Sequence, residues 1–238
     1  MLLALLLAAS PTVADANAAG MKLYQAKRYP EAIEQFKAAI DSATGQPSTK
    51  EEVAQSRALA LAHFNLACAM ALARKAGKTC EVGAYMGVVW EHVLESIRLD
   101  PSRLEKAVTD PDLKELRGTL QFQSLLGLSP ARESDLPKLL PIVTWYVQGG
   151  AYGPTRDLTF SANGTVELTL RLPNADGFPL DFRHFKGRWT LKGRELKLVF
   201  SEAVPEVNAK EVVFTFSPEG SLRGALGSFS EGLSECEA

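Results

Sequence analysis

The sequence predicts an α+β protein of two domains, with a helical N-terminal half and a C-terminal antiparallel β-barrel or sandwich. Three observations lead to this prediction. Apolar residues recur with a helical period from 17 to about 127, a segment with three prolines follows, and apolar residues then alternate as they do in strands. The expected divisions are a signal peptide at 1–16, a helical domain at 17–128, a linker at 129–141 and a β domain at 142–238.

Composition and charge exclude several classes of function. The 238 residues include 26 Lys+Arg and 28 Asp+Glu, so the formal net charge is −2. This near-neutral balance gives no reason to expect a nucleic acid or an anionic membrane as partner. A hydrophobic content of 46% with 23% charged residues is typical of globular chains. Three cysteines are too few for a disulfide-stapled scaffold.

The N-terminus resembles a secretory signal. Met1–Ala9 is an apolar run too short to span a bilayer, which takes about 20 residues. Ala14-Asp15-Ala16 follows it as a small-x-small cleavage pattern, although no Lys or Arg precedes the apolar run. We therefore expect an exported protein, periplasmic or extracellular, with no stable membrane span after cleavage because no later stretch is apolar enough. The alternative is an apolar first helix that packs on the following domain.

The first predicted helical hairpin lies between 17 and 41. Tyr29-Pro30 separates its two helices, and proline is tolerated at a first helical position because its missing N–H has no partner there anyway. Apolar stripes of helical period lie on both sides, made by Ala19, Leu23 and Ala26 before the turn and by Ala32, Ile33, Phe36, Ala39 and Ile40 after it. This pattern predicts a short helix, a tight turn and a second helix.

The same run resembles a tetratricopeptide repeat, whose packing positions are occupied by Gly20, Ala32, Phe36 and Ala39. A second, stretched repeat follows. Residues 51–76 contain no Pro or Gly and predict one long helix, in which 63–72 resembles the first helix of a repeat. Residues 96–101 resemble the end of the second helix, so the turn at 75–87 carries an insertion. Short closing helices are expected at 110–117 and 119–127.

The resemblance implies a binding groove. In this family the first helix of each hairpin lines a concave groove that takes an extended peptide or a partner helix. Asn65 matches the position that often hydrogen-bonds a peptide backbone, whereas Asn17 and Met21 depart from the Lys and Asn of carboxylate-clamping members. We therefore expect an apolar or amphipathic segment of a protein partner in the cell envelope. By position, the groove residues are Asn17, Met21, Tyr24, Gln25, Leu61, Phe64, Asn65, Cys68 and Leu72.

An alternative use of these groove residues stays open. Several of them could instead pack on the closing helices or on the β domain, because so short an array has to cover both of its ends.

The C-terminal half predicts about seven short strands. Asn163-Gly164 between two of them is a strong hairpin signal. Many short strands without intervening helices favour an antiparallel barrel or sandwich. The strands are expected at 145–147, 158–160, 166–170, 188–191, 196–200, 212–216 and 222–226.

The stretch 187–200, with Gly187-Arg188-Trp189, is similar to small lipocalin-like barrels of exported proteins. This resemblance implies the alternative function, a carrier of a small apolar ligand. In lipocalins the Gly-x-Trp motif lies on the first strand, whereas here it lies in the middle of the domain.

Residue patterns for catalysis are missing from the sequence. No Ser stands in a Gly-x-Ser-x-Gly elbow, and no phosphate-binding glycine loop precedes a helix. His92 and Glu95 share a helical face and could supply two metal ligands, but no second pair completes a site. We interpret His92 as a surface histidine beside a solvated carboxylate. We therefore expect no enzyme, no cofactor and no metal.

The cysteines leave two arrangements open. Cys68 lies on the long predicted helix and Cys80 in the inserted turn, so the two could form a disulfide in an oxidising compartment. Two separate buried thiols are the alternative, because spacing does not decide connectivity. Cys236 is then a free thiol or part of an intermolecular bridge.

Overall fold

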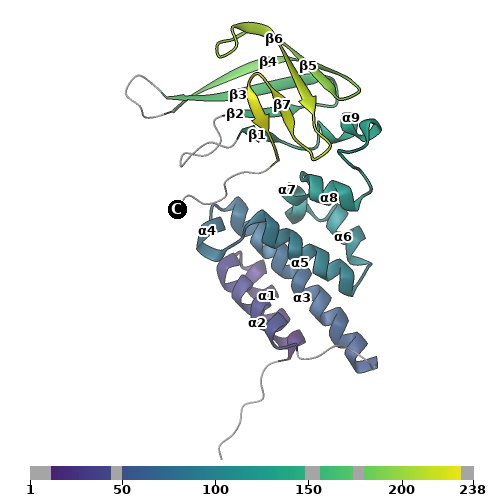
Figure 1. Ribbon diagram of the computed structural model, residues 1–238. Coiled ribbons are helices and arrows are strands. Elements are labelled where there is room, and N and C mark those ends of the chain that lie inside the picture. The colour runs from purple at the N-terminus through teal and green to yellow at the C-terminus, as the bar shows by residue number, and fades with distance from the viewer. Residues whose placement is uncertain (1–11, 44–49, 148–155, 174–179, 232–238) are drawn as a thin grey trace, which may run out of the picture. The chain divides into compact units, whose positions relative to one another are not determined.

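The computed structural model describes residues 12–43, 50–147, 156–173 and 180–231 of the chain (Figure 1). The chain divides into a first unit, Met1–Leu116, and a second unit, Arg117–Ala238. The described part of the first unit is helical, and the second unit carries the strands. The α+β prediction is confirmed, but the boundary lies before residue 117 and not near 128 as we expected.

Two helical hairpins form the first unit. Helices α1 and α2 are the first predicted hairpin, and α3 and α5 are the second, with α4 in the predicted insertion. Helix α6 was not predicted. The bounds are α1 (Val13–Gln25), α2 (Tyr29–Asp41), α3 (Lys50–Lys75), α4 (Thr79–Val82), α5 (Met86–Leu99), α6 (Arg103–Thr109), the 3₁₀ turn η1 (Pro111–Leu113) and α7 (Lys114–Arg117).

Helix α1 begins earlier than we expected. Thr12 caps it, and the side chains of Thr12 and Asp15 form a reciprocal capping box. Val13 and Ala16 are buried in a cluster with Ala39 of α2. Residues 13–16, which the signal-peptide prediction removes, are thus a packed helical turn. Residues 1–11 lie outside the described residues, and cleavage after Ala16 stays a prediction.

Helix α3 is the centre of the first unit. It is buried along much of its length and contacts α1, α2, α4, α5 and η1. The stretch Ser56–Lys75 is long and apolar enough to cross a membrane by length and composition, and most of it is buried inside the unit. This finding corrects our expectation that no later stretch reaches that composition. The apolar composition of this stretch is explained by its burial on several sides, because a helix that is apolar all round is stable only when other parts of the protein cover it.

The second unit opens with short helices and continues as an antiparallel sheet in which each strand pairs with the next. Backbone hydrogen bonds in both directions between Tyr146 and Ser230 join the first strand to the end of the last, so the sheet forms a nearly closed barrel. The short helices are α8 (Leu120–Leu125), η2 (Glu133–Asp135) and α9 (Leu136–Leu139).

Eight strands are described where about seven were predicted, because the last predicted run, 222–226, contains β7 and the start of a tight turn, and β8 after that turn was not predicted. The predicted Asn163-Gly164 turn is confirmed between β2 and β3, with Gly164 at φ 84°. The predicted turn at 174–177 lies outside the described residues. The strands are β1 (Trp145–Val147), β2 (Arg156–Phe160), β3 (Thr165–Pro173), β4 (Leu180–Lys192), β5 (Glu195–Val204), β6 (Ala209–Phe216), β7 (Leu222–Gly224) and β8 (Gly227–Phe229).

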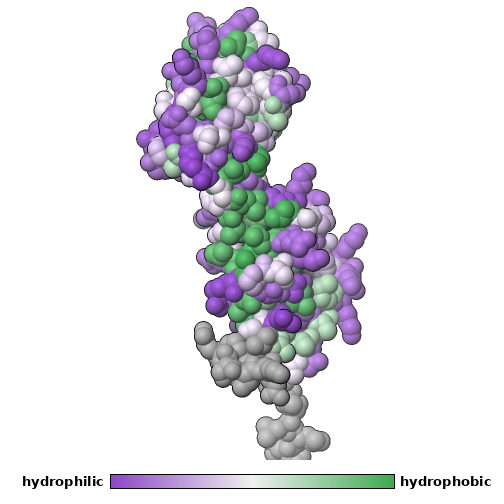
Figure 2. Space-filling model, turned by 90° about the vertical axis from the view of Figure 1, so that its right-hand side faces the viewer, coloured by the Kyte–Doolittle hydropathy of each residue, from purple (hydrophilic) through white to green (hydrophobic). Residues whose placement is uncertain are grey.

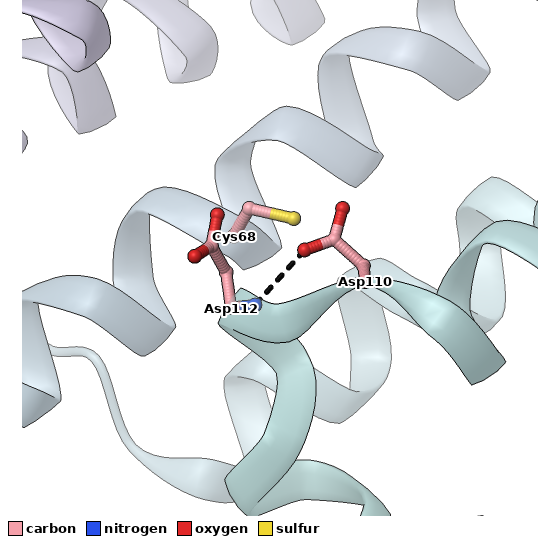
Figure 3. A group of neighbouring side chains, drawn as sticks. All are labelled: Cys68, Asp110 and Asp112. Atoms are coloured by element: carbon pink, nitrogen blue, oxygen red, sulfur yellow. Dashed lines mark hydrogen bonds between the residues drawn. The ribbon is translucent and has the colours of Figure 1, made fainter.

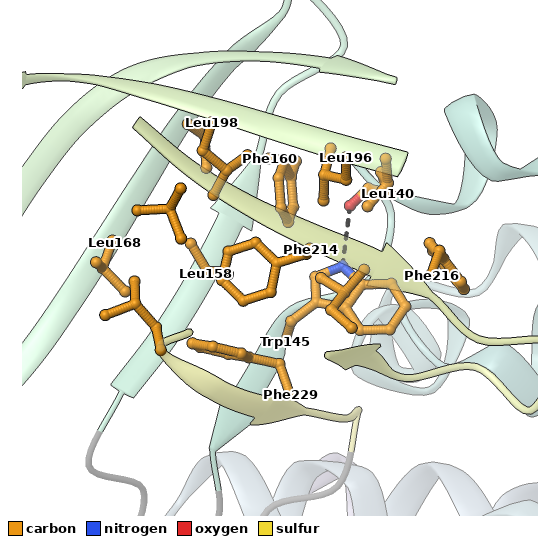
Figure 4. Packing of buried hydrophobic residues seen from close by; sticks show 14 of the residues in the cluster. Leu140, Trp145, Leu158, Phe160, Leu168, Leu196, Leu198, Phe214, Phe216 and Phe229 are labelled. Carbon is orange, nitrogen blue, oxygen red and sulfur yellow. Dashed lines mark hydrogen bonds between the residues drawn. The ribbon is translucent and has the colours of Figure 1, made fainter. Parts of the chain in front are cut away.

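Large aromatic side chains occupy the barrel core (Figure 4). Trp145, Phe214, Phe216 and Phe229 are fully buried, and two edge-to-face pairs connect them. The ring centroids of Trp145 and Phe216 are 5.2 Å apart, a favourable separation for such pairs. The Trp145 indole N–H donates to the carbonyl of Leu140 at 3.3 Å, which satisfies its polar edge inside the core.

The segment 129–141 is not a linker, which corrects that prediction. Leu136, Leu139 and Leu140 are fully buried members of the barrel core. Their spacing of three and one residues places them on one face of α9 and the turn after it. The three prolines that suggested a linker therefore interrupt a segment that packs on the sheet.

The Gly-x-Trp motif lies on the fourth strand. Gly187 pairs with Phe200 of β5, and a Cβ at this position would lie 2.5 Å from the Val199 carbonyl oxygen, so only glycine fits without a shift. Trp189 donates to the Ser161 carbonyl at 3.1 Å. The tryptophan of the first strand is Trp145, and Val143-Thr144 precede it instead of Gly-x.

Gly20 is required by the close approach of α1 and α2. A Cβ on Gly20 would lie 2.5 Å from the ring of the fully buried Phe36, whereas a Cβ on Gly87 of α5 would meet nothing within 4 Å. We expect Gly20→Ala to lower the free energy of unfolding by about 1–3 kcal/mol through overpacking. The matched helical substitution Gly87→Ala should leave it unchanged or raise it by up to about 1 kcal/mol. Urea titrations followed by circular dichroism measure both. Equal stability of the two variants would contradict the predicted contact.

Candidate functional site

The predicted groove residues lie on α1 and α3, which contact each other. Asn17 of α1 and Asn65 of α3 are brought together, because the Asn65 Nδ2 donates to the Asn17 Oδ1 at 3.0 Å. Asn17 is buried and Asn65 is partly exposed. A hydrogen bond between two of the predicted groove residues therefore connects the first helices of the two hairpins.

A later segment of the same unit lies against α3. We call Arg103–Leu116 the covering segment; it contains α6, η1 and most of α7. The Arg103 guanidinium lies 6.0 Å from the centroid of the Phe64 ring, and Phe64 is only 6% exposed. Leu113 and Leu116 of the segment are fully buried. Phe64 thus belongs to the core of the unit, which corrects its assignment to an open groove.

An ion pair fixes the end of the covering segment. Arg74 Nη2 of α3 lies 2.9 Å from Glu115 Oε1, and its Nη1 donates to the Ala84 carbonyl at 2.9 Å. The Arg74 side chain is 8% exposed and the Glu115 side chain 51% exposed, so only the arginine end of the pair is withdrawn from water.

Three side chains with metal-ligating atoms meet where η1 contacts α3 (Figure 3). The Cys68 thiol and the carboxylates of Asp110 and Asp112 each offer one atom, and these atoms all lie within 4.8 Å of one another. Asp110 caps η1 by accepting the Asp112 backbone N–H at 2.9 Å. The Tyr24 hydroxyl of α1 donates to the Asp112 carboxylate. This cluster therefore connects α1, α3 and the covering segment.

Burial raises the pKa values of two groups in this region, the Cys68 thiol and the Tyr24 phenol. Cys68 is 4% exposed, and its burial, with the charges of Asp110 and Asp112, raises the pKa of its thiol well above the usual value. Burial and the hydrogen bond to Asp112 also raise the pKa of Tyr24. At neutral pH the thiol and the phenol keep their protons beside two carboxylates. Thiolate and carboxylate are zinc ligands, so a metal here would first have to displace the thiol proton.

The other predicted groove residues stay at least partly accessible. Gln25 is exposed, and Met21, Leu61 and Leu72 are partly exposed. Apolar side chains also reach the surface elsewhere on the first unit, since Leu94 of α5 is 43% exposed and Val108 of α6 is 37% exposed. Figure 2 shows hydrophobic residues gathered on one face of the molecule.

The predicted disulfide between Cys68 and Cys80 is wrong. Cys68 is a free, buried thiol, and its face of α3 meets the two carboxylates of η1 instead of the inserted turn. Cys80 is disulfide-bonded. Cys236 lies outside the described residues.

Sequence reasoning missed Asp110 and Asp112 as neighbours of Cys68. They flank Pro111 at the start of the segment 110–117, for which the sequence predicted only a short closing helix. More than 40 residues separate them from Cys68, and no spacing rule connects such distant positions.

Comparisons with known proteins add little to this description. No family model matches the sequence, and no curated protein matches it. Among solved structures, the second half of the fold is similar to a lipocalin-like protein from Bacteroides uniformis at 21% sequence identity, with a TM-score of 0.24. The match covers 37% of this chain and 92% of that protein.

The bond from Tyr24 to Asp112 should stabilise the first unit measurably. We expect Tyr24→Phe to lower the free energy of unfolding by about 1–3 kcal/mol, because a hydrogen bond to a charged group is lost. The matched control is Tyr29→Phe, since Tyr29 packs edge-to-face on Tyr24 and the described residues show no hydrogen bond of its hydroxyl.

The raised pKa of Tyr24 predicts how the stabilisation by its hydroxyl changes with pH. Because the folded chain raises the pKa of Tyr24 above 10.0, the stabilisation is full below pH 10 and is lost as the pH rises further. The stability difference between wild type and Tyr24→Phe should therefore shrink above pH 10. A difference that grows at high pH would contradict the assigned bond.

Proposed function

We propose that the chain is an exported, non-enzymatic scaffold that binds a peptide or helix of a protein partner in the cell envelope. The binding face is the accessible part of the surface formed by α1 and α3, with Asn65 at its centre. The partner segment is apolar or amphipathic, as the partly exposed Met21, Leu61 and Leu72 favour.

The state of the Asn65 side chain carries this proposal. A carboxamide offers two N–H donors and one carbonyl acceptor with two lone pairs. In the described part of the chain, Asn65 makes one side-chain hydrogen bond, to Asn17, and stays partly exposed. One donor and the acceptor are therefore available to a peptide group of a bound segment. The bond to Asn17 holds the carboxamide in place, which lowers the entropic cost of binding.

The charges beside this face favour a basic side chain in the partner. Asp110 and Asp112 are partly exposed, and their carboxylates lie close together beside this face. A Lys or Arg of the partner would place its charge near both carboxylates. Complementary charges of this kind raise the association rate and fix the register of a bound segment.

The chemistry of Cys68 supports a function without catalysis. Reactive cysteines have lowered pKa values in electropositive, partly exposed surroundings. Cys68 is buried, lies beside two carboxylates and has a raised pKa. It therefore has the features of an inert structural thiol, not of a nucleophile.

The alternative proposal is a carrier of a small apolar ligand, and the packing of the barrel core is relevant to whether such a ligand fits. A carrier of a small apolar ligand needs a cavity inside the barrel. In the described residues, Trp145, Phe214, Phe216 and Phe229 have no exposed surface and pack on one another. Ligand entry at this level of the barrel would require these side chains to move apart.

Substitution of the two asparagines tests the scaffold. Immobilised full-length chain is incubated with an envelope extract, and captured proteins are quantified by mass spectrometry. We expect Asn65→Ala to reduce capture of the partner about tenfold, which corresponds to about 1.4 kcal/mol and to the loss of one or two hydrogen bonds. Asn17→Ala breaks the same Asn–Asn bond but keeps the Asn65 carboxamide, so capture should fall by less than in Asn65→Ala, because only the positioning of the carboxamide is lost.

The paired variants also exclude a merely structural effect, because both lose the same internal hydrogen bond. Phe64→Ala is unsuitable, since truncating this buried ring would cost about 3–5 kcal/mol of stability. Equal capture by wild type and Asn65→Ala would contradict the proposal. Saturable binding of an apolar dye by a chain that captures no protein would favour the carrier.

A further inference from the structure

Two histidines of the second hairpin face each other. His63 lies on α3 and His92 on α5, and their Nδ1 atoms are 3.0 Å apart. The ring centroids are 5.1 Å apart, with the ring planes inclined by 40°. His63 is only 8% exposed, and His92 is partly buried. Our interpretation of His92 as a surface histidine beside a solvated carboxylate is therefore wrong, because its neighbour is a second imidazole.

The distance between the two Nδ1 atoms is close to the distance between two nitrogen ligands of one zinc ion. Zinc binds imidazole nitrogen at about 2.0–2.1 Å with tetrahedral angles, which places two ligating nitrogens about 3.3 Å apart. The observed 3.0 Å is a few tenths of an ångström shorter. A metal between them would require the nitrogens to move apart by this amount and both rings to turn so that their lone pairs meet at one point.

Both imidazoles are in the form that binds metals. Their burial lowers both pKa values, that of His92 to about 4, so both rings are neutral at pH 7. One Nδ1 carries a proton and the other accepts it in a direct hydrogen bond. If a metal bound both Nδ1 atoms, the donor ring would move its proton from Nδ1 to Nε2, so both rings would stay neutral and the metal would take the place of the hydrogen bond between α3 and α5.

Charges from the surrounding helices act on the pair in both directions. Glu95, one turn after His92 on α5, acts on both rings and favours a cation. Lys37 of α2 opposes a cation at His92, and Arg98 opposes one at His63. In the structure, the Glu95 carboxylate accepts two hydrogen bonds of 2.7 Å from Arg98. In the structure the Glu95 oxygens do not form a ligand group with the two imidazoles, so a site that includes Glu95 requires its carboxylate to leave Arg98 and turn toward the rings.

We propose that His63 and His92 bind a divalent transition-metal ion of the zinc type through their Nδ1 atoms, with the Glu95 carboxylate as third ligand. Imidazole is a preferred ligand of zinc, copper and nickel, and carboxylate completes zinc sites of this composition. The site joins the two helices of the second hairpin and is independent of the proposed partner binding.

This site is separate from the cluster around Cys68. Five residues along α3 separate His63 from Cys68, which places the two side chains about 140° apart around the helix axis. One faces α5 and the other faces η1. A metal at one position therefore has different ligands from a metal at the other, and single substitutions distinguish them.

Titration of metal-free, full-length chain with Zn²⁺ tests the proposal by isothermal calorimetry at pH 7.5. We expect one Zn²⁺ per chain, with affinity reduced at least tenfold by His63→Gln and by His92→Gln, and to a smaller extent by Glu95→Gln. Cys68→Ser and His184→Gln should bind as wild type does, because His184 pairs with Glu167 on the barrel surface, outside this unit. Co²⁺ in place of Zn²⁺ should give tetrahedral d–d absorption without a thiolate charge-transfer band.

Three results would overturn the proposal. The first is wild-type chain that binds no Zn²⁺, and the second is unchanged affinity in both histidine variants. The third is a thiolate band with Co²⁺ that disappears in Cys68→Ser, which would place the metal at the other cluster. Circular dichroism checks that each variant is folded. If His63→Gln does not fold, the affinity of His92→Gln for Zn²⁺ decides the test, because His92 is only partly buried. Unchanged affinity in Glu95→Gln would overturn the third ligand.

Discussion

Helix α3 imposes the constraint on which the first unit depends. Its residues are apolar around most of the circumference, and its small and aliphatic side chains from Ala60 to Ala73 are largely buried. A helix of this kind is stable in water only when neighbours cover it on several sides. Helices α2 and α5 lie along it, α1 and α4 contact it as well, and η1 contacts a further part of it. The arrangement of the unit follows from the need to cover this one helix.

The covering segment is the least expected consequence of this constraint. A groove along α1 and α3 would leave Phe64, Cys68 and their neighbours in water. Instead Arg103 lies over Phe64, and Leu113 and Leu116 are buried in the unit. Two polar contacts accompany this burial, since Tyr24 bonds to Asp112 and Arg74 to Glu115. What stays accessible is a narrower face, where Asn65 is held by Asn17.

The sequence was informative where the signal was local. The period of apolar residues located both hairpins and the long α3, and turn residues such as Asn163-Gly164 located most of the strands, although β4 begins eight residues before its predicted start and β8 was missed. Contacts between distant segments were not readable. The leucines of 136–140 looked like part of a proline-rich linker, and only the barrel core explains them. His63 and Asp110 carried no local signal of the side chains that they would meet, since helix packing sets those contacts.

The covering segment is part of the folded core, and native-state labelling of the Cys68 thiol tests this most directly. The full-length chain is exposed to a thiol alkylating reagent over a series of urea concentrations, and labelling of the peptide containing Cys68 is quantified by mass spectrometry. Because Cys68 is 4% exposed and its pKa is raised, we predict no labelling until the first unit unfolds. Labelling of Cys68 without denaturant, at the rate of an exposed thiol, would contradict the account.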